Sequence, residues 1–292
     1  MVPFIGIASG IAAGNPGCGK APLFLQQNPH LLEQIPHEWV ELFLAPVASQ
    51  NLYQSLGALY HQIAEKIFQT YNQHGYLLSM GGDHSCAIAT WSGIAEAVRP
   101  NGDLGLLWID AHMDSHTPET SESGNIHGMP LATLLGYGNS HLTEILTKKP
   151  KLLPQNLALV GIRSYESGEA ELLRRLGVRV YFMEEVRERG LKEVIEEAVE
   201  RVSQNTIGYG VSFDLDALDP SHCPAVGTPV EGGLDPEELL ASFSNFYKRP
   251  PIAFEVVEYN PLLDNDLKTA QLLIRFLDKI VSDALHKLSF VV

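Results

Sequence analysis

Short apolar runs recur along the whole chain and alternate with longer amphipathic segments. The runs are rich in Val, Ile and Leu and mostly lack polar alternation, a pattern typical of parallel strands that are buried on both faces. The expected strands are 4–8, 76–82, 104–110, 157–162, 178–183, 208–214 and 252–259.

The segments between these runs show the spacing of amphipathic helices. In 51–75, Leu or Ile recurs every three or four residues from Leu52 to Ile67, and Gly75 is expected to end the helix. The same spacing predicts helices within 191–205, 235–248 and 267–288.

Alternation of strand and helix over most of the length predicts an α/β fold. No repeat, low-complexity linker or break in composition interrupts the chain, so residues 1–292 are expected to form a single domain. Segment 13–36, rich in Gly, Pro and Asn, is expected to be a long loop at the rim.

The chain is strongly acidic, with 20 Lys and Arg against 35 Asp and Glu and a formal charge of -15. Such a charge repels nucleic acid phosphates and anionic membrane surfaces, so a neutral or cationic small partner fits better. No apolar run approaches the roughly 18 residues of a membrane span. Three cysteines without a C-x-x-C motif, and an N-terminus without a basic signal region, favour free thiols and a cytoplasmic location.

Polar residues with metal-binding chemistry gather in three segments, each directly after an expected strand. The segments are "GGDHS" at 81–85, "DAHMDSH" at 110–116 and "SFDLDALDP" at 212–220. Open α/β sheets place their ligand crevices at this carboxyl edge. If the strands continue, alternation puts Asp110, His112 and Asp114 on one side, and likewise Asp214 and Asp216.

Converging carboxylates need a counter-charge, because a buried ionised group without a partner costs several kcal/mol or becomes protonated. No Lys or Arg lies within the three segments, so a metal is the economical cation. Six ligands exceed one tetrahedral zinc, whereas two bridged ions would use them all, and oxygen ligands with some imidazole suit manganese. The candidate ligands are His84, Asp110, His112, Asp114, Asp214 and Asp216.

Each segment also has a simpler structural interpretation. "GGDHS" alone is a glycine turn before a helix, with Asp83 as the cap, and "DLDALDP" alone is a strand end followed by an Asp-Pro turn. Three such segments at three strand ends favour a site over coincidence. Asp219 is nevertheless interpreted as a turn residue or a support for the ligands.

Together with "GIRSYESGE" at 161–169 and "EVVEYNP" at 255–261, these segments resemble the ureohydrolase family, the manganese enzymes that include arginase and agmatinase. The match covers nearly the whole chain in order. It implies a single three-layer α/β/α domain with a mostly parallel sheet and two Mn²⁺ at its carboxyl edge. In this resemblance one manganese is held by His84, Asp110, Asp114 and Asp214, and the other by His112, Asp110, Asp214 and Asp216.

The resemblance also implies the chemistry. A hydroxide held between the two ions would attack a guanidinium carbon, since bound metals depress the pKa of water. Asp114 would pass a proton to the leaving amine, Glu258 would orient the guanidinium, and His127 would shuttle protons. Without the resemblance, Glu258 would be interpreted as a strand-end salt bridge and His127 as a helix cap.

Substrate choice depends on the far end of the site. The spacing from Asp114 to His127 resembles arginase, in which this loop binds the α-carboxylate of arginine, and the tripeptide from Thr228 to Val230 differs from the agmatinase pattern. The predicted reaction is hydrolysis of L-arginine to L-ornithine and urea. The residues expected to bind substrate are His116, Ser121, Ser123, Asn125, Glu166 and Thr228.

Two positions depart from the family pattern, with His116 where arginases commonly carry Asn and Glu166 where Asp is usual. An agmatinase, guanidinobutyrase or formiminoglutamase therefore stays open as the alternative enzyme. A non-catalytic member of the family would lack ligands, and a zinc deacetylase on a similar fold would need a single-metal site. Family members usually assemble, so a homo-oligomer is expected.

Overall fold

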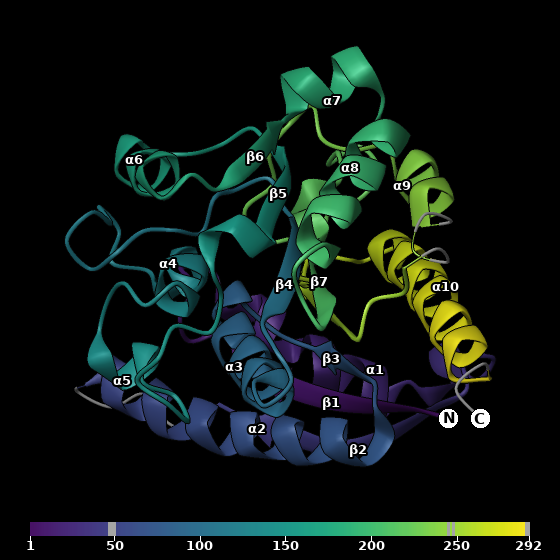
Figure 1. Ribbon diagram of the computed structural model, residues 1–292. Coiled ribbons are helices and arrows are strands. Elements are labelled where there is room, and N and C mark those ends of the chain that lie inside the picture. Colours follow the sequence, from purple (N-terminus) through teal and green to yellow (C-terminus); the bar gives the residue numbers. More distant parts are fainter. Residues whose placement is uncertain (46–50, 244–245, 247–248, 290–292) are drawn as a thin grey trace.

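The computed structural model describes residues 1–45, 51–243, 246 and 249–289 (Figure 1). Its centre is one eight-stranded sheet in the order β2-β1-β3-β8-β7-β4-β5-β6, and every neighbouring pair is parallel. The strands are β1 Val2–Ala8, β2 His37–Leu44, β3 Leu77–Met80, β4 Leu104–Ile109, β5 Leu157–Ile162, β6 Arg179–Phe182, β7 Gly208–Asp214 and β8 Ala253–Val257. The seven expected strands are confirmed, and the α/β fold class with them.

Strand β2 was not expected. Its sequence "HEWVELFL" interrupts the apolar positions with Glu38 and Glu41, and most of its residues are only half-buried. The strand lies at the edge of the sheet beside β1, where one side of the ladder stays open. A strand that buries little surface carries no continuous apolar run, so the criterion that found the central strands misses it.

Helices cover both faces of the sheet and complete three layers (Figure 1). One core cluster joins α1, α7, α8, α9 and α10 to the sheet, and a second cluster on the other face includes residues of α2, α3 and α4. The helices are α1 Ala21–Gln27, α2 Leu52–His74, α3 Ala87–Val98, α4 Pro130–Leu134, α5 Ser140–Thr143, α6 Ser167–Leu176, α7 Met183–Arg189, α8 Leu191–Ser203, α9 Pro236–Ser242 and α10 Lys268–Ser289.

The predicted helices are present, with some differences in extent. Helix α2 ends at Gly75, whose left-handed backbone (φ 69°) gives the expected C-cap. Helix α9 covers the first part of 235–248, and residues 244–245 and 247–248 of that prediction lie outside the described residues.

The prediction of a continuous loop over 13–36 is wrong. The segment contains α1 and two turns of 3-10 helix, Pro16–Lys20 and Pro29–Leu32, and it buries Leu25 and Leu32 in the core. These elements are seven residues long or shorter, so their apolar residues are too few to show a helical period among the Gly and Pro residues.

Candidate active site

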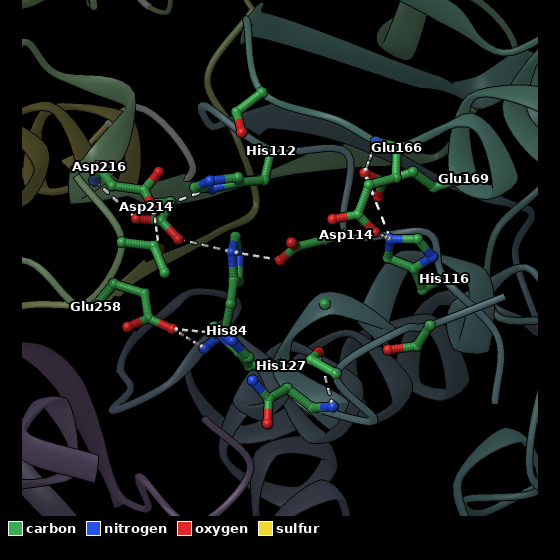
Figure 2. Close-up of a pocket in the computed structure, with 16 residues that line it drawn as sticks. His84, His112, Asp114, His116, His127, Glu166, Glu169, Asp214, Asp216 and Glu258 are labelled. Atoms are coloured by element: carbon green, nitrogen blue, oxygen red, sulfur yellow. Dashed lines mark hydrogen bonds and ion pairs between the residues drawn. The ribbon is translucent and has the colours of Figure 1, made fainter. Parts of the chain in front are cut away.

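The three polar segments and Glu258 meet at the carboxyl edge of the four central strands. They follow β3, β4, β7 and β8, which are adjacent in the sheet although β3 and β8 are separated by more than 170 residues of chain. There they surround a cavity of about 250 Å³ (Figure 2). Its lining is His84, His112, Asp114, His116, Ser121, Ser123, Asn125, His127, Gly128, Ser164, Glu166, Glu169, Asp214, Asp216, Thr228 and Glu258.

Two groups of atoms that could hold a metal ion lie side by side in this cavity. His84 Nδ1 is 3.1 Å from an oxygen of Asp110 and of Asp114, and 3.0 Å from an oxygen of Asp214. Figure 2 shows the His84 ring between the carboxylates of Asp214 and Asp114. His112 Nδ1 is 3.1 Å from Asp216 Oδ2 and 3.5 Å from Asp110 Oδ1. Asp110 thus belongs to both groups, with one oxygen toward each.

The carboxylates converge through turns, so the condition that the strands continue through these residues is not met. Strand β4 ends at Ile109, and Asp114 has a left-handed backbone (φ 46°) that extended chain does not adopt. Strand β7 ends at Asp214, and the 3-10 turn Leu215–Ala217 follows at once.

Burial and mutual repulsion control the protonation of these groups. Burial is the largest cause that raises the pKa of Asp214 well above its usual range, and Asp216 adds to it. Burial and the nearby Asp110 raise the pKa of Asp114 to about 6. Burial lowers the pKa of His112, but Asp216 and Asp110 outweigh it and raise the value to about 12. Without a bound cation, the repulsion among these carboxylates is therefore relieved by protonation of the cluster.

The donor set fits divalent cations. His84 Nδ1 is buried and, despite three carboxylate oxygens nearby, has no hydrogen-bond partner within the described part of the chain. Carboxylate oxygens around an unpartnered imidazole nitrogen are the ligands that manganese or a similar divalent ion accepts. A cation at each group would remove the repulsion that otherwise requires protons.

Glu258 and His127 form a pair beside the metal-ligating groups. Glu258 follows β8 with a left-handed backbone (φ 66°), and its Oε1 accepts a hydrogen bond from the backbone N–H of His84 at 2.9 Å. His127 Nδ1 lies 3.2 Å from the same oxygen. Burial lowers the pKa of His127, but Glu258 outweighs it and raises the value to about 9. Glu258 Oε2 is buried without a hydrogen-bond partner among the described residues.

The two positions that depart from the family pattern contact each other. His116 Nε2 lies 2.6 Å from Glu166 Oε2 and 3.7 Å from Glu169 Oε1. Figure 2 shows these three residues across the cavity from Asp214 and Asp216. His116 Nδ1 faces Thr120 Oγ1 at 3.1 Å, so both ring nitrogens have partners.

The remaining predicted residues also line the cavity. Ser121 Oγ accepts a hydrogen bond from Gly124 N, and Ser123 Oγ accepts one from Asn125 N, which leaves both hydroxyl protons free to point elsewhere. Thr228 Oγ1 donates to Asp216 Oδ2 at 2.9 Å, a contact with a candidate metal ligand that the sequence did not indicate.

Asp83 and Asp219 have structural contacts, as expected. Asp83 caps the 3-10 turn His84–Cys86 by accepting a hydrogen bond from Ser85 N. Asp219 accepts hydrogen bonds from the backbone of Ser221 and Gly232 and joins two loops.

Sequence reasoning missed several residues of the site. Glu169 lines the cavity and accepts hydrogen bonds from the backbone of Glu166 and Ser115; its place three residues after Glu166 is the capping-box signal that could have found it. Trp108 stacks on His84 with ring centroids 4.1 Å apart and donates to Asp110 Oδ2 at 2.8 Å. As part of an apolar run, Trp108 gave no sign of this contact.

The fold and the cavity define a class of protein, an α/β/α domain with a carboxylate-imidazole metal group at the carboxyl edge of a parallel sheet. The family model described as "Arginase family" matches residues 2–282. An arginase of Bacillus caldovelox is 40% identical over 225 residues, which are 77% of this chain and 74% of the relative. An arginase of Brevibacillus brevis is 42% identical over 209 residues, 71% of this chain and 69% of the relative. The chain belongs to the arginase family.

Solved structures agree with this assignment. The structure of Bacillus subtilis arginase has a TM-score of 0.86 at 33% identity and covers 96% of this chain and 98% of its own. A proclavaminate amidino hydrolase of Streptomyces clavuligerus, at 23% identity and a TM-score of 0.76, covers 97% of this chain and 91% of its own and shares the fold. Among the described residues, no helix has the length and apolarity that crossing a membrane requires.

Proposed function

We propose that this chain is a metal-dependent hydrolase that converts L-arginine to L-ornithine and urea, with two manganese ions per chain. The main support for arginine as the substrate is the similarity to arginases, among them one that is 42% identical. An arginase of Entamoeba histolytica, solved in complex with L-ornithine, has a TM-score of 0.86 at 30% identity and covers 96% of this chain and 97% of its own.

The two groups described above would hold the metals. The first group, His84 with Asp110, Asp114 and Asp214, would hold one ion. The second group, His112 with Asp110 and Asp216, would hold the other, with Asp214 as the further ligand that the family resemblance implies. When bound, the ions would lower the pKa of water so that a hydroxide nucleophile is available near neutral pH.

Glu258 would bind and orient the guanidinium. Its Oε2 is buried and unpartnered, so it can accept hydrogen bonds from a planar N–H donor at little desolvation cost. Gly227 leaves room for that donor, because a Cβ there would lie 3.1 Å from Oε2. The hydrogen bond from His84 N fixes the other oxygen, which sets the angle at which the guanidinium carbon is presented.

Asp114 and His127 would move the protons. The Asp114 carboxylate lies beside His84, with Oδ2 3.1 Å from His84 Nδ1, so it is placed to take a proton at the site and release it to the leaving amine. The imidazole of His127, with its pKa raised to about 9, holds a proton at neutral pH and lies at the cavity wall. It can therefore protonate the departing amine and exchange with solvent.

The opposite wall would recognise the amino-acid end of the substrate. Ser121 and Ser123 have hydroxyl protons to donate to a carboxylate, and the Asn125 amide lies in the same loop. His116 and Glu166 contact each other at this wall. The imidazole can donate a hydrogen bond to an α-carboxylate, and the carboxylate can accept one from an α-amino group. Thr228 would contact the substrate from the cavity wall while its hydroxyl donates a hydrogen bond to Asp216.

The contact between His116 and Glu166 favours one further candidate, hydrolysis of another guanidino or amidino compound such as agmatine, guanidinobutyrate or formiminoglutamate. Incubation of the manganese-loaded protein with each compound and with L-arginine distinguishes them by the product released. Urea and ornithine from arginine are expected, and urea from agmatine with none from arginine would overturn the proposal.

The assembly and location belong to the same proposal. The three cysteines are buried and free, which is consistent with a reducing cytoplasm. A homo-oligomer acting on a small cationic guanidino substrate is expected, and the mass of the protein in solution measures it.

A further inference from the structure

A row of polar side chains crosses the central sheet below the cavity. Ser79 on β3 pairs with Glu255 on β8, Glu255 with Ser212 on β7, and Ser212 with Trp108 on β4. Register partners on parallel strands point to the same face. All four residues are completely buried, so a carboxyl group among them costs several kcal/mol unless it is hydrogen-bonded.

Glu255 is bound by two donors through a single oxygen. Its Oε2 accepts hydrogen bonds from Trp91 Nε1 at 3.0 Å and from Ser212 Oγ at 2.8 Å. Ser212 Oγ also lies 3.0 Å from His84 Nε2. A hydroxyl has one proton to donate. Because Ser212 donates that proton to Glu255, it must accept the hydrogen bond from His84 Nε2–H.

The proton on Nε2 determines what the other side of the ring offers. A histidine that binds a metal is neutral and carries one N–H. With that proton on Nε2, His84 presents a lone pair at Nδ1, the atom that faces Asp110, Asp114 and Asp214. The stack on Trp108, with ring planes 8° apart, fixes the plane of the imidazole. Ring plane and tautomer are thus both set by residues outside the cavity.

We propose that Ser212 and Glu255 are positioning residues that hold His84 in the tautomer able to bind a divalent cation through Nδ1. The inference rests on the metal dependence of the proposed function, but not on the choice of substrate. Neither residue touches the cavity. In metal sites, such hydrogen bonds to the non-ligating imidazole nitrogen raise metal affinity by about 10- to 100-fold.

A purely structural role is the alternative, since Glu255 also binds Trp91 of α3 and thereby ties the helix to the sheet. Ser79 provides the matched control. It lies in the same row on the other side of Glu255, is equally buried, and accepts a hydrogen bond from Thr90 Oγ1 instead of joining the path to His84.

The experiment measures the Kd of MnCl₂ for chelator-stripped protein by calorimetric titration. Ser212→Ala is expected to raise that Kd by about 10- to 100-fold, whereas Ser79→Ala leaves it unchanged and Ser212→Thr, which keeps the hydroxyl, restores it. At saturating manganese, Ser212→Ala regains most of the wild-type kcat with KM unchanged. An unchanged Kd in Ser212→Ala, or an equal rise in Ser79→Ala, overturns the inference.

Two further outcomes are separable. If Ser212→Ala does not fold, Glu255→Gln has nearly the same shape and is expected to raise the Kd in the same direction by a smaller factor; an unchanged Kd there also overturns the inference. If the wild-type protein binds manganese but releases no urea from arginine, the proposed substrate is wrong. The change in Kd then still tests whether Ser212 and Glu255 hold the tautomer of His84. A wild-type protein that binds no manganese overturns both.

Discussion

At the scale of single residues, two aspartates of the site each accept a backbone hydrogen bond with one oxygen and face His84 with the other. Asp110 Oδ1 accepts a hydrogen bond from His112 N, and Asp214 Oδ1 accepts one from Asp216 N, both at 2.7 Å. This local turn is a geometry that aspartate forms readily. In both, Oδ2 remains to face His84, so the turn that reverses the chain also aims the second oxygen.

Replacing one candidate ligand tests whether metal binding depends on that residue or only on the loops around it. Asp216→Ala is expected to abolish urea production and lower the bound manganese per chain, because His112 loses its nearest carboxylate. Asp219→Ala is the control, since Asp219 accepts hydrogen bonds from the backbone of its own turn and of the loop at Gly232; it should keep its metal and lose about 1 kcal/mol of stability. Metal analysis and urea assay measure both, and full activity in Asp216→Ala would refute the ligand assignment.

The contact between His116 and Glu166 predicts energetic coupling. His116→Asn and Glu166→Asp each remove the 2.6 Å contact, so each is expected to raise KM for arginine, and the double variant to raise it by less than the product. Pairs in contact couple by about 1 kcal/mol, roughly fivefold in KM. The exposed pair Glu171 and Arg174 on α6 is the control cycle and should leave KM unchanged. Effects of His116 and Glu166 that simply multiply would contradict the prediction.

At this scale, a site residue could be predicted from the sequence when it follows an apolar run, and not when it lies inside one. All metal-ligating candidates were visible because they follow apolar runs as clustered Asp and His. Ser212 lies inside such a run, and its partner His84 is 128 positions away, so no local pattern connects them. Glu255 is a charge within the apolar run 252–259, and that was the available signal, but its partners Trp91 and Ser212 depend on strand order.

At the scale of elements, burial decided which ones were predictable. Strands β4 and β5 are buried on both faces and show it as unbroken apolar runs. The edge strand β2 and the short helix α1 bury fewer side chains and lack a period long enough to detect. Helix ends were predictable where backbone conformation restricts the residue type, as at Gly75.

Gly75 provides a test of that restriction. A left-handed backbone disfavours any residue with a Cβ by about 1 kcal/mol, and a Cβ at Gly75 would meet no atom within 4 Å, so strain alone would act. Gly75→Ala should lower the free energy of unfolding by about that amount, measured by urea denaturation with an unchanged slope. Gln73→Ala, an exposed position in the same helical turn, is the control and should have no effect. Equal stability of Gly75→Ala and wild type would contradict the capping role.

At the scale of the whole molecule, the strand order assembles the site. The chain forms β3, crosses to build β4, β5 and β6, and returns to insert β7 and β8 between β3 and β4. This order makes the four polar strand ends neighbours. The apolar pattern predicts strands and their common edge but not their order. The three-layer fold and the convergence of His84 with Asp214 were therefore expected only from the family resemblance, and the structure adds the strand order that brings them together.

Gathering these side chains at one edge should make global stability depend on bound cations. Without metal, buried aspartates repel each other, and the pKa of Asp214 is raised well above its usual range by burial and by Asp216. A ligand of the folded state at 100 times its Kd adds about 2.7 kcal/mol. For a chain of this size, saturating manganese should raise Tm by about 5 to 10 °C.

Thermal unfolding of the manganese-loaded protein, before and after chelation, measures this dependence. Chelator is expected to lower Tm, and added MnCl₂ to restore it, because the ion binds the folded site and not the separated residues of the unfolded chain. His84→Ala is the control: it lacks the nitrogen at the centre of the first group, so chelation should change its Tm much less. If chelator leaves the wild-type Tm unchanged, the carboxylates are stabilised by protons alone, and the two-metal assignment would have to be abandoned.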